Sequence, residues 1–132
     1  MPIKTRLTTK GFAEYLERLQ KAGRDIDAVS DQALMQGGEI LLTGMKTRVP
    51  KDTHALENSL KIDGPQQDGN FHFIEVGVID ANDDVARYGN AQEFGWSDHA
   101  ANPYVRPTLD GDMAKARAEM RKVFVNAEVG ID

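Results

Sequence analysis

The sequence of 132 residues contains no cysteine, which excludes disulfide bonds, thiolate metal sites, iron–sulfur clusters and cysteine nucleophiles. It also has no run of about 18 apolar residues, so no transmembrane helix is expected. Residues 1–6 are not followed by the apolar segment of a signal peptide, and none is predicted. We therefore expect the chain to fold in a cytosol or in a particle assembled there.

Sequence motifs of several enzyme classes are also missing. There is no glycine-rich phosphate loop and no Gly-x-Ser-x-Gly nucleophile elbow. The three histidines, His54, His72 and His99, do not have the spacing of a zinc-binding helix. Asp98 and His99 could supply two metal ligands, although a solvated polar loop has the same composition. A small hydrolase that uses Glu93 or the Asp98–His99 pair remains an alternative, but we predict no enzyme activity, no cofactor and no metal site.

Positive charge is scarce in the second half of the chain. The net charge is −5, and residues 61–132 carry 7 basic and 13 acidic side chains, a balance of −6, whereas residues 1–60 have a balance of +1. A surface of negative sign repels phosphate backbones. We therefore expect no sequence-specific binding of nucleic acid.

Hydrophobic residues make up 40% of the chain and charged residues 28%, which is typical of a globular protein. The length predicts a single domain over residues 1–132, with a frayed tail from about residue 126 to residue 132.

Three segments have the apolar spacing of amphipathic helices: residues 9–22, 25–48 and 107–125. The core stripe expected for the second helix is Ile26, Val29, Ala33, Ile40 and Leu41. Gly37, Gly38 and Gly44 interrupt this helix, and a break at the first two would give two short helices. We favour one long helix that packs closely on another backbone, because the stripe resumes in phase beyond the glycines. Pro50 is expected to end it.

Two segments between the long helices have strand character. Apolar residues alternate from Leu56 to Asp63, although the first turn could be helical, and they occupy both faces of residues 71–79, which indicates an inner strand. Residues 64–70 have the composition of a loop, so the segment from Leu56 to Ile79 is predicted to be a hairpin. A hairpin is too small to stand alone, so either residues 3–8 or a neighbouring subunit must extend the sheet. The predicted class is α+β, a small antiparallel sheet packed by the long N-terminal helix and the C-terminal helix.

A short helix over residues 82–95, with Asn82 or Asp83 as its cap, is followed by a loop over residues 96–103. Aromatic residues and an arginine gather around this loop, and such residues dominate protein interfaces. A local core that pins the loop has the same composition, and both interpretations stay open. Glu93 is placed to accept hydrogen bonds from loop amides or from Arg106.

Three segments, in order, carry a resemblance. Residues 49–60 (VPKDTHALENSL) are similar to a Val/Ala-Pro-x-Asp-Thr-Gly-x-Leu-x-x-Ser-Ile/Leu pattern. Residues 88–95 (YGNAQEFG) are similar to a Tyr followed five residues later by Glu, then an aromatic or aliphatic residue and Gly. Residues 101–109 (ANPYVRPTL) are similar to Pro-Phe-Leu-Arg-Pro-Ala-Leu. These patterns resemble those of tail-completion or minor tail components of lambda-like tailed bacteriophages, to which minor tail protein Z is related. The chain departs from them at His54, where the family has a Gly that supplies a positive φ, and at Trp96, where the family usually has Thr.

The resemblance implies a structural virion protein that completes the tail or joins it to the head. It would lie in the tail or neck and assemble in the host cytoplasm. It implies a homo-oligomeric ring, a hexamer by the sixfold symmetry of tail tubes, with other tail or neck proteins as partners and DNA passing through the ring. A non-phage binding module is the remaining alternative. The residues expected to form the assembly interface or to pin the loop are Tyr88, Glu93, Phe94, Gly95, Trp96, Tyr104, Arg106 and Pro107.

Overall fold

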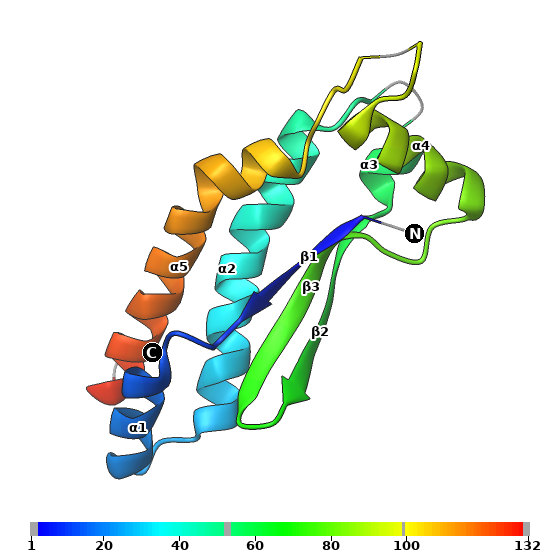
Figure 1. The fold of residues 1–132 in the computed structure, drawn as a ribbon. Helices are drawn as coiled ribbons and strands as arrows, with labels where there is room; N and C mark the ends of the chain where they lie inside the picture. Colours follow the sequence, from blue (N-terminus) through cyan, green and yellow to red (C-terminus); the bar gives the residue numbers. More distant parts are fainter. Residues whose placement is uncertain (1–2, 52–53, 99, 131–132) are drawn as a thin grey trace.

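A computed structural model describes residues 3–51, 54–98 and 100–130 of the chain (Figure 1). The strands are β1 (Lys4–Thr8), β2 (Leu60–Asp68) and β3 (Phe71–Val78), and the helices are α1 (Ala13–Lys21), α2 (Ile26–Arg48), α3 (Ala55–Asn58), α4 (Asp83–Phe94) and α5 (Arg106–Glu128). A small antiparallel sheet with helices around it confirms the α+β class. No helix in the described part of the chain has the length and apolarity needed to cross a bilayer.

The sheet has the order β1-β3-β2, and both strand pairs are antiparallel. The central position of β3 confirms the inner strand that its apolar sequence predicted. The third strand comes from the N-terminus, where Leu7 is the register partner of Ile74. The sheet therefore reaches three strands within one copy of the chain.

The first part of the predicted hairpin differs from the structure in one place and follows the stated alternative in another. Residues 55–58 form the single turn α3, the helical alternative for the first turn, because Leu56 and Leu60 are also one helical turn apart and both are buried. Residues 64–68 belong to β2 and not to a loop. The register of β2 shifts between Asp63 and Gln66. Pro65 lies in this irregular part of an edge strand, where the backbone N–H that proline lacks is not needed for pairing with β3.

Helix α2 runs as one unbroken helix between the sheet and α5 (Figure 1). A Cβ atom on Gly38 would lie 2.4 Å from Cδ1 of Ile74, and one on Gly44 would lie 2.2 Å from Oδ2 of Asp112. This confirms the single helix. The atoms that approach its glycines belong to side chains and not to the other backbone that had been predicted.

In the predicted core stripe Ala33 and Leu41 are fully buried, and its other members are half-buried and pack against the core. Leu34 and Met45, beside the stripe, are fully buried as well. A helix that packs against partners on two sides also buries its glycines. A search for periodic hydrophobic residues does not include glycine and therefore underestimates the buried surface of such a helix.

Two helix ends differ from the predictions. Helix α1 begins at Ala13 and not at residue 9, because the amide of Thr9 donates to the carbonyl of His72 at 3.0 Å and continues the sheet pairing. Helix α5 extends through Glu128, so the frayed tail predicted from residue 126 is wrong for its first three residues. Glu128 forms an ion pair with Arg18 at 3.3 Å that joins the end of α5 to α1. Residues 131–132 lie outside the described part of the chain.

Candidate functional site

The candidate site comprises the end of α4, the loop after it and the start of α5. The carboxamide oxygen of Asn82 accepts a hydrogen bond from the Val85 amide at 2.9 Å, which caps α4 as predicted. Gly95 follows α4 with φ of 73°, a backbone conformation that suits glycine. This turn directs the chain outward into the loop that leads to Arg106, the first residue of α5.

Glu93 is fully buried and joins α4 to the start of α5. Its Oε1 accepts hydrogen bonds from the amides of Tyr104 and Val105, both at 2.8 Å. Its Oε2 accepts from the amide of Arg106 at 3.0 Å and from Nε of the same residue at 2.9 Å. The guanidinium of Arg106 also donates to the carbonyl oxygen of Glu93. The carboxylate therefore accepts hydrogen bonds from amides that have no partner within α5. Its negative charge also interacts favourably with the positive end of the α5 helix dipole.

These contacts keep the Glu93 carboxyl ionised. Burial by itself raises its pKa, but the three amides and the Arg106 side chain stabilise the carboxylate, and the net pKa lies below its ordinary value. A general acid needs a raised pKa, and a general base needs an oxygen that faces a substrate. Because both oxygens of Glu93 are occupied by the protein itself, the geometry supports a positioning role for Glu93.

Tyr104 is a core residue. Its side chain is fully buried and its hydroxyl donates to the carbonyl oxygen of Gly89 at 3.1 Å. A Cβ atom on Gly89 would lie 2.9 Å from that hydroxyl oxygen, so α4 can approach Tyr104 only at a glycine. Burial, together with the negative charge of Glu93, raises the pKa of the Tyr104 phenol. The backbone carbonyl oxygen of Tyr104 accepts a hydrogen bond at 2.7 Å from the hydroxyl of Thr108 in α5. Pro107 occupies the first turn of the same helix.

Other candidates of the same segment face solvent. Phe94 is 63% exposed and Trp96 is 51% exposed. The Arg106 guanidinium carbon lies 5.3 Å from the centre of the Phe94 ring. Tyr88 and Ala91 are half-buried and line a shallow apolar hollow together with Trp96. We name Tyr88, Ala91, Phe94 and Trp96 the aromatic patch. Glu93 and Tyr104 are thus directed inward, whereas Phe94 and Trp96 face solvent.

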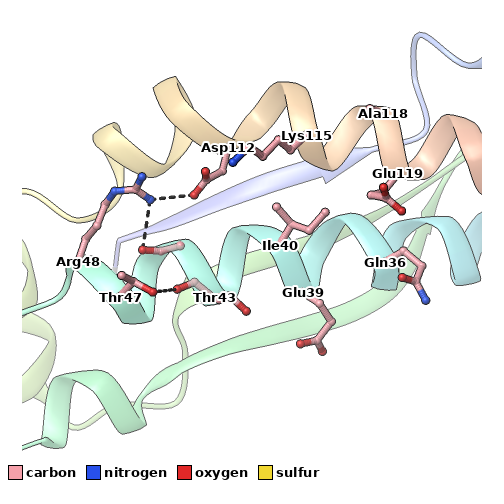
Figure 2. A pocket seen from close by; sticks show the side chains of 11 residues that line it. Gln36, Glu39, Ile40, Thr43, Thr47, Arg48, Asp112, Lys115, Ala118 and Glu119 are labelled. Carbon is pink, nitrogen blue, oxygen red and sulfur yellow. Dashed lines mark hydrogen bonds and ion pairs between the residues drawn. The ribbon is translucent and has the colours of Figure 1, made fainter.

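A second surface feature was not predicted from the sequence. An open groove of about 820 Å³ lies between α2 and α5 (Figure 2). At one end Nη1 of Arg48 donates to Oδ2 of Asp112 at 2.8 Å and to the Thr108 hydroxyl at 3.1 Å. We name this feature the α2–α5 groove; its lining is Gln36, Glu39, Ile40, Thr43, Gly44, Thr47, Arg48, Asp112, Lys115, Ala118 and Glu119. Its two walls are more than sixty residues apart in the chain, so no local pattern indicates it.

His72 forms a polar clamp between the sheet and α2. Its Nδ1 lies 2.7 Å from Oδ1 of Asp31, and its Nε2 lies 3.0 Å from Oδ1 of Asp27. The two aspartates are one helical turn apart on α2. This spacing is visible in the sequence, but it does not indicate a contact with His72 unless the position of β3 beside α2 is known. This clamp fixes the sheet on the helix and leaves the ring nitrogens of His72 occupied.

The alternative catalytic residues are not brought together. Asp98 is exposed, and His99 lies outside the described residues, so the pair is not placed. Glu75, whose place in the apolar sequence of β3 makes it another candidate for a partly buried carboxylate, is half-buried and forms an ion pair with Lys4 at 3.3 Å. Within residues 3–51, 54–98 and 100–130, no group of three or more acidic or histidine side chains could hold a metal ion.

His54 has φ of 60°, the left-handed conformation expected at the position where the resembling sequences have Gly. Its Nδ1 lies 2.9 Å from Oε1 of Glu57, and this hydrogen bond lowers the pKa of the Glu57 carboxyl. The short polar side chains of Asp52 and Thr53 in the same motif predict a turn before the strand, and both residues lie outside the described part of the chain.

The sequence profile of one known family matches residues 12–95 of the chain. The family is HK97-gp10-like, described as a tail component of bacteriophage HK97. The matched segment extends from α1 to the glycine after α4 and includes Glu93 and Phe94. Searches of the curated proteins and of the solved structures returned no match.

Proposed function

Because the chain belongs to the HK97-gp10-like family of bacteriophage tail components, we propose that it is a structural protein that completes the tail or joins it to the head. In this proposal it is a component of the virion, in the tail or neck, and it acts as a ring of copies that contacts other tail or neck proteins. The favoured ring is a hexamer, since tail tubes have sixfold symmetry, and DNA would pass through it.

The observation that carries the proposal is the family match together with the aromatic patch on a firmly held segment. Large apolar side chains that face solvent in a rigid setting are typical of interaction sites. The buried Glu93 carboxylate stabilises that segment. Both features serve assembly, and neither provides a reactive group for catalysis.

Deletion of the coding sequence from the phage or prophage that encodes the chain tests this function. We expect electron microscopy to show unjoined heads and tails, or unfinished tails, with infectivity restored by the wild-type gene supplied in trans. Normal, infectious particles without the gene would overturn the proposal.

A matched pair of variants links the phenotype to the aromatic patch. Trp96→Ala should fail to restore infectivity. Val129→Ala should restore it, because Val129 is similarly exposed, at 64%, but lies beyond the end of α5, away from the patch. If the two variants restored infectivity equally, the aromatic patch would not be required for the function.

A further inference from the structure

His72 lies where three parts of the fold meet. It is the second residue of β3, and its buried side chain faces the first two turns of α2. Its backbone carbonyl oxygen accepts a hydrogen bond from the amide of Thr9 at 3.0 Å, and its amide donates to the Thr9 hydroxyl at 3.0 Å. His72 therefore joins the start of β3 both to α2 and to the connection between β1 and α1.

The hydrogen bonds of the His72 ring depend on how many protons the ring carries. Nδ1 and Nε2 each face a carboxylate oxygen, that of Asp31 at 2.7 Å and that of Asp27 at 3.0 Å. An ionised carboxylate only accepts hydrogen bonds, and a neutral imidazole has a single N–H. A neutral ring can therefore donate to one aspartate, and its other nitrogen directs a lone pair at the second carboxylate. Both contacts are favourable together when the ring carries both protons.

The charged groups around the ring are acidic. Asp27 and Asp31 approach it from α2, and their side chains are 73% and 45% exposed, which favours their ionised forms. On β2 the register partner of His72 is Gln67, which is uncharged. On α1, Glu17 lines the same hollow as Asp27 and is also acidic. Burial of the ring opposes a positive charge, but two charge-assisted hydrogen bonds stabilise it.

We propose that the polar clamp is a proton-dependent latch between the start of β3 and the first two turns of α2. With two protons on the His72 ring, both aspartates are bound and the latch is closed. With one proton, one of the two bonds is lost and this end of the sheet loosens from α2. The latch is therefore closed from about pH 4, where aspartate side chains ordinarily ionise, up to the pH at which His72 loses a proton, and it opens above that pH. This inference concerns the response of the fold to pH and goes beyond the proposed function.

NMR spectra of the histidine ring nitrogens, recorded on the full chain from pH 5 to pH 9, test the latch. They distinguish a doubly protonated ring from either neutral tautomer. We expect the His72 ring of the wild type to carry mainly both protons at pH 7. In the double variant Asp27→Asn with Asp31→Asn, the ring should lose its proton about one pH unit lower or more. The control Glu14→Gln removes a first-turn carboxylate from α1 and should leave the titration of His72 unchanged.

Amide hydrogen exchange of the wild type tests whether the proton acts on the sheet. The reporters are the amides of Thr9 and His72, which join the two strands beside the latch. After correction for the intrinsic exchange rate, their protection should fall roughly tenfold as the His72 ring loses its proton. The amide of Tyr104, bonded to Glu93, is a remote reference and should keep its protection.

Two results would overturn the inference. One is a wild-type His72 ring that carries mainly a single proton at pH 7, or whose titration is unchanged in the double variant. The other is constant protection of the Thr9 and His72 amides across the titration of His72, because the proton would then have no effect on the sheet.

Discussion

Glu93 is the residue that organises the site. Buried carboxylates are stable only when their oxygens are paired, and here each oxygen accepts two hydrogen bonds from residues 104–106. Arg106 donates three hydrogen bonds to Glu93, one from its backbone amide and two from its side chain. The end of one helix thus supplies the N-terminal cap of another, which replaces the local capping side chain that α5 lacks.

Glu93→Gln should destabilise the fold by about 2–3 kcal/mol, because the amide nitrogen cannot accept hydrogen bonds and the charge-assisted bonds are lost. Urea denaturation measures the change. The control is Glu119→Gln, a surface residue that pairs with Lys122 at 2.8 Å and should cost less than about 1 kcal/mol. Equal losses in the two variants would show that Glu93 does not hold the segment.

The stability that Glu93 contributes should depend on pH. Its pKa in the folded protein lies below the ordinary value of 4.5, so the contribution is fully present above that pH and is lost as the pH falls through the folded pKa. The difference in unfolding free energy between the wild type and Glu93→Gln should therefore stay constant from about pH 6 to pH 8 and shrink below about pH 4. A difference that grows in acid would contradict the assignment.

Sequence reasoning predicts the contacts of Glu93 because the residue and its partners stand in one short segment. It cannot tell that Tyr104 is buried while Trp96 is exposed, since both are aromatics on the same loop. The partnership of Arg48 with Asp112 was missed altogether, because it depends on how α2 and α5 cross.

At the scale of elements, α2 decides the architecture. It packs on the sheet along one side and on α5 along another, and glycines allow both approaches. Periodicity predicts such long helices well. It leaves α3 open between helix and strand, because one turn of helix shares its apolar spacing with a strand. It fails along β2, because an irregular edge strand has the composition of a loop.

Gly38→Ala should therefore destabilise the protein by about 1–3 kcal/mol, since the new methyl group would meet Cδ1 of Ile74 in the core. Gly111→Ala is the matched control on α5, where the nearest atom is Nη2 of Arg48 at 3.3 Å and the gain in helix propensity offsets the contact. We expect the control to stay within about 1 kcal/mol of the wild type. Thermal and urea unfolding of the two variants distinguish these outcomes, and an equal effect would argue against close packing at Gly38.

At the scale of the whole molecule, the chain presents two separate surfaces, the aromatic patch and the α2–α5 groove. Membership of a phage tail-component family indicates a structural component of the tail. The stabilising contacts of Glu93 and Tyr104 lie inside, and the aromatic patch, which we propose takes part in assembly, lies outside.

This separation predicts that assembly and stability respond to different residues. The double variant Phe94→Ala with Trp96→Ala should leave the free energy of unfolding within about 1 kcal/mol of the wild type, because both side chains are exposed. The same variant should not be incorporated into particles, whereas Val129→Ala should be. Urea denaturation together with immunoblotting of purified particles measures both effects, and a stable variant that is incorporated normally would contradict the separation.

The central claim is that the protein is a virion component present as a ring. Quantitative mass spectrometry of purified particles, with isotope-labelled peptides of the chain as standards, tests it most directly. We expect a constant number of copies in each particle, about six for the favoured ring. Infectious particles that contain none of the protein would contradict it.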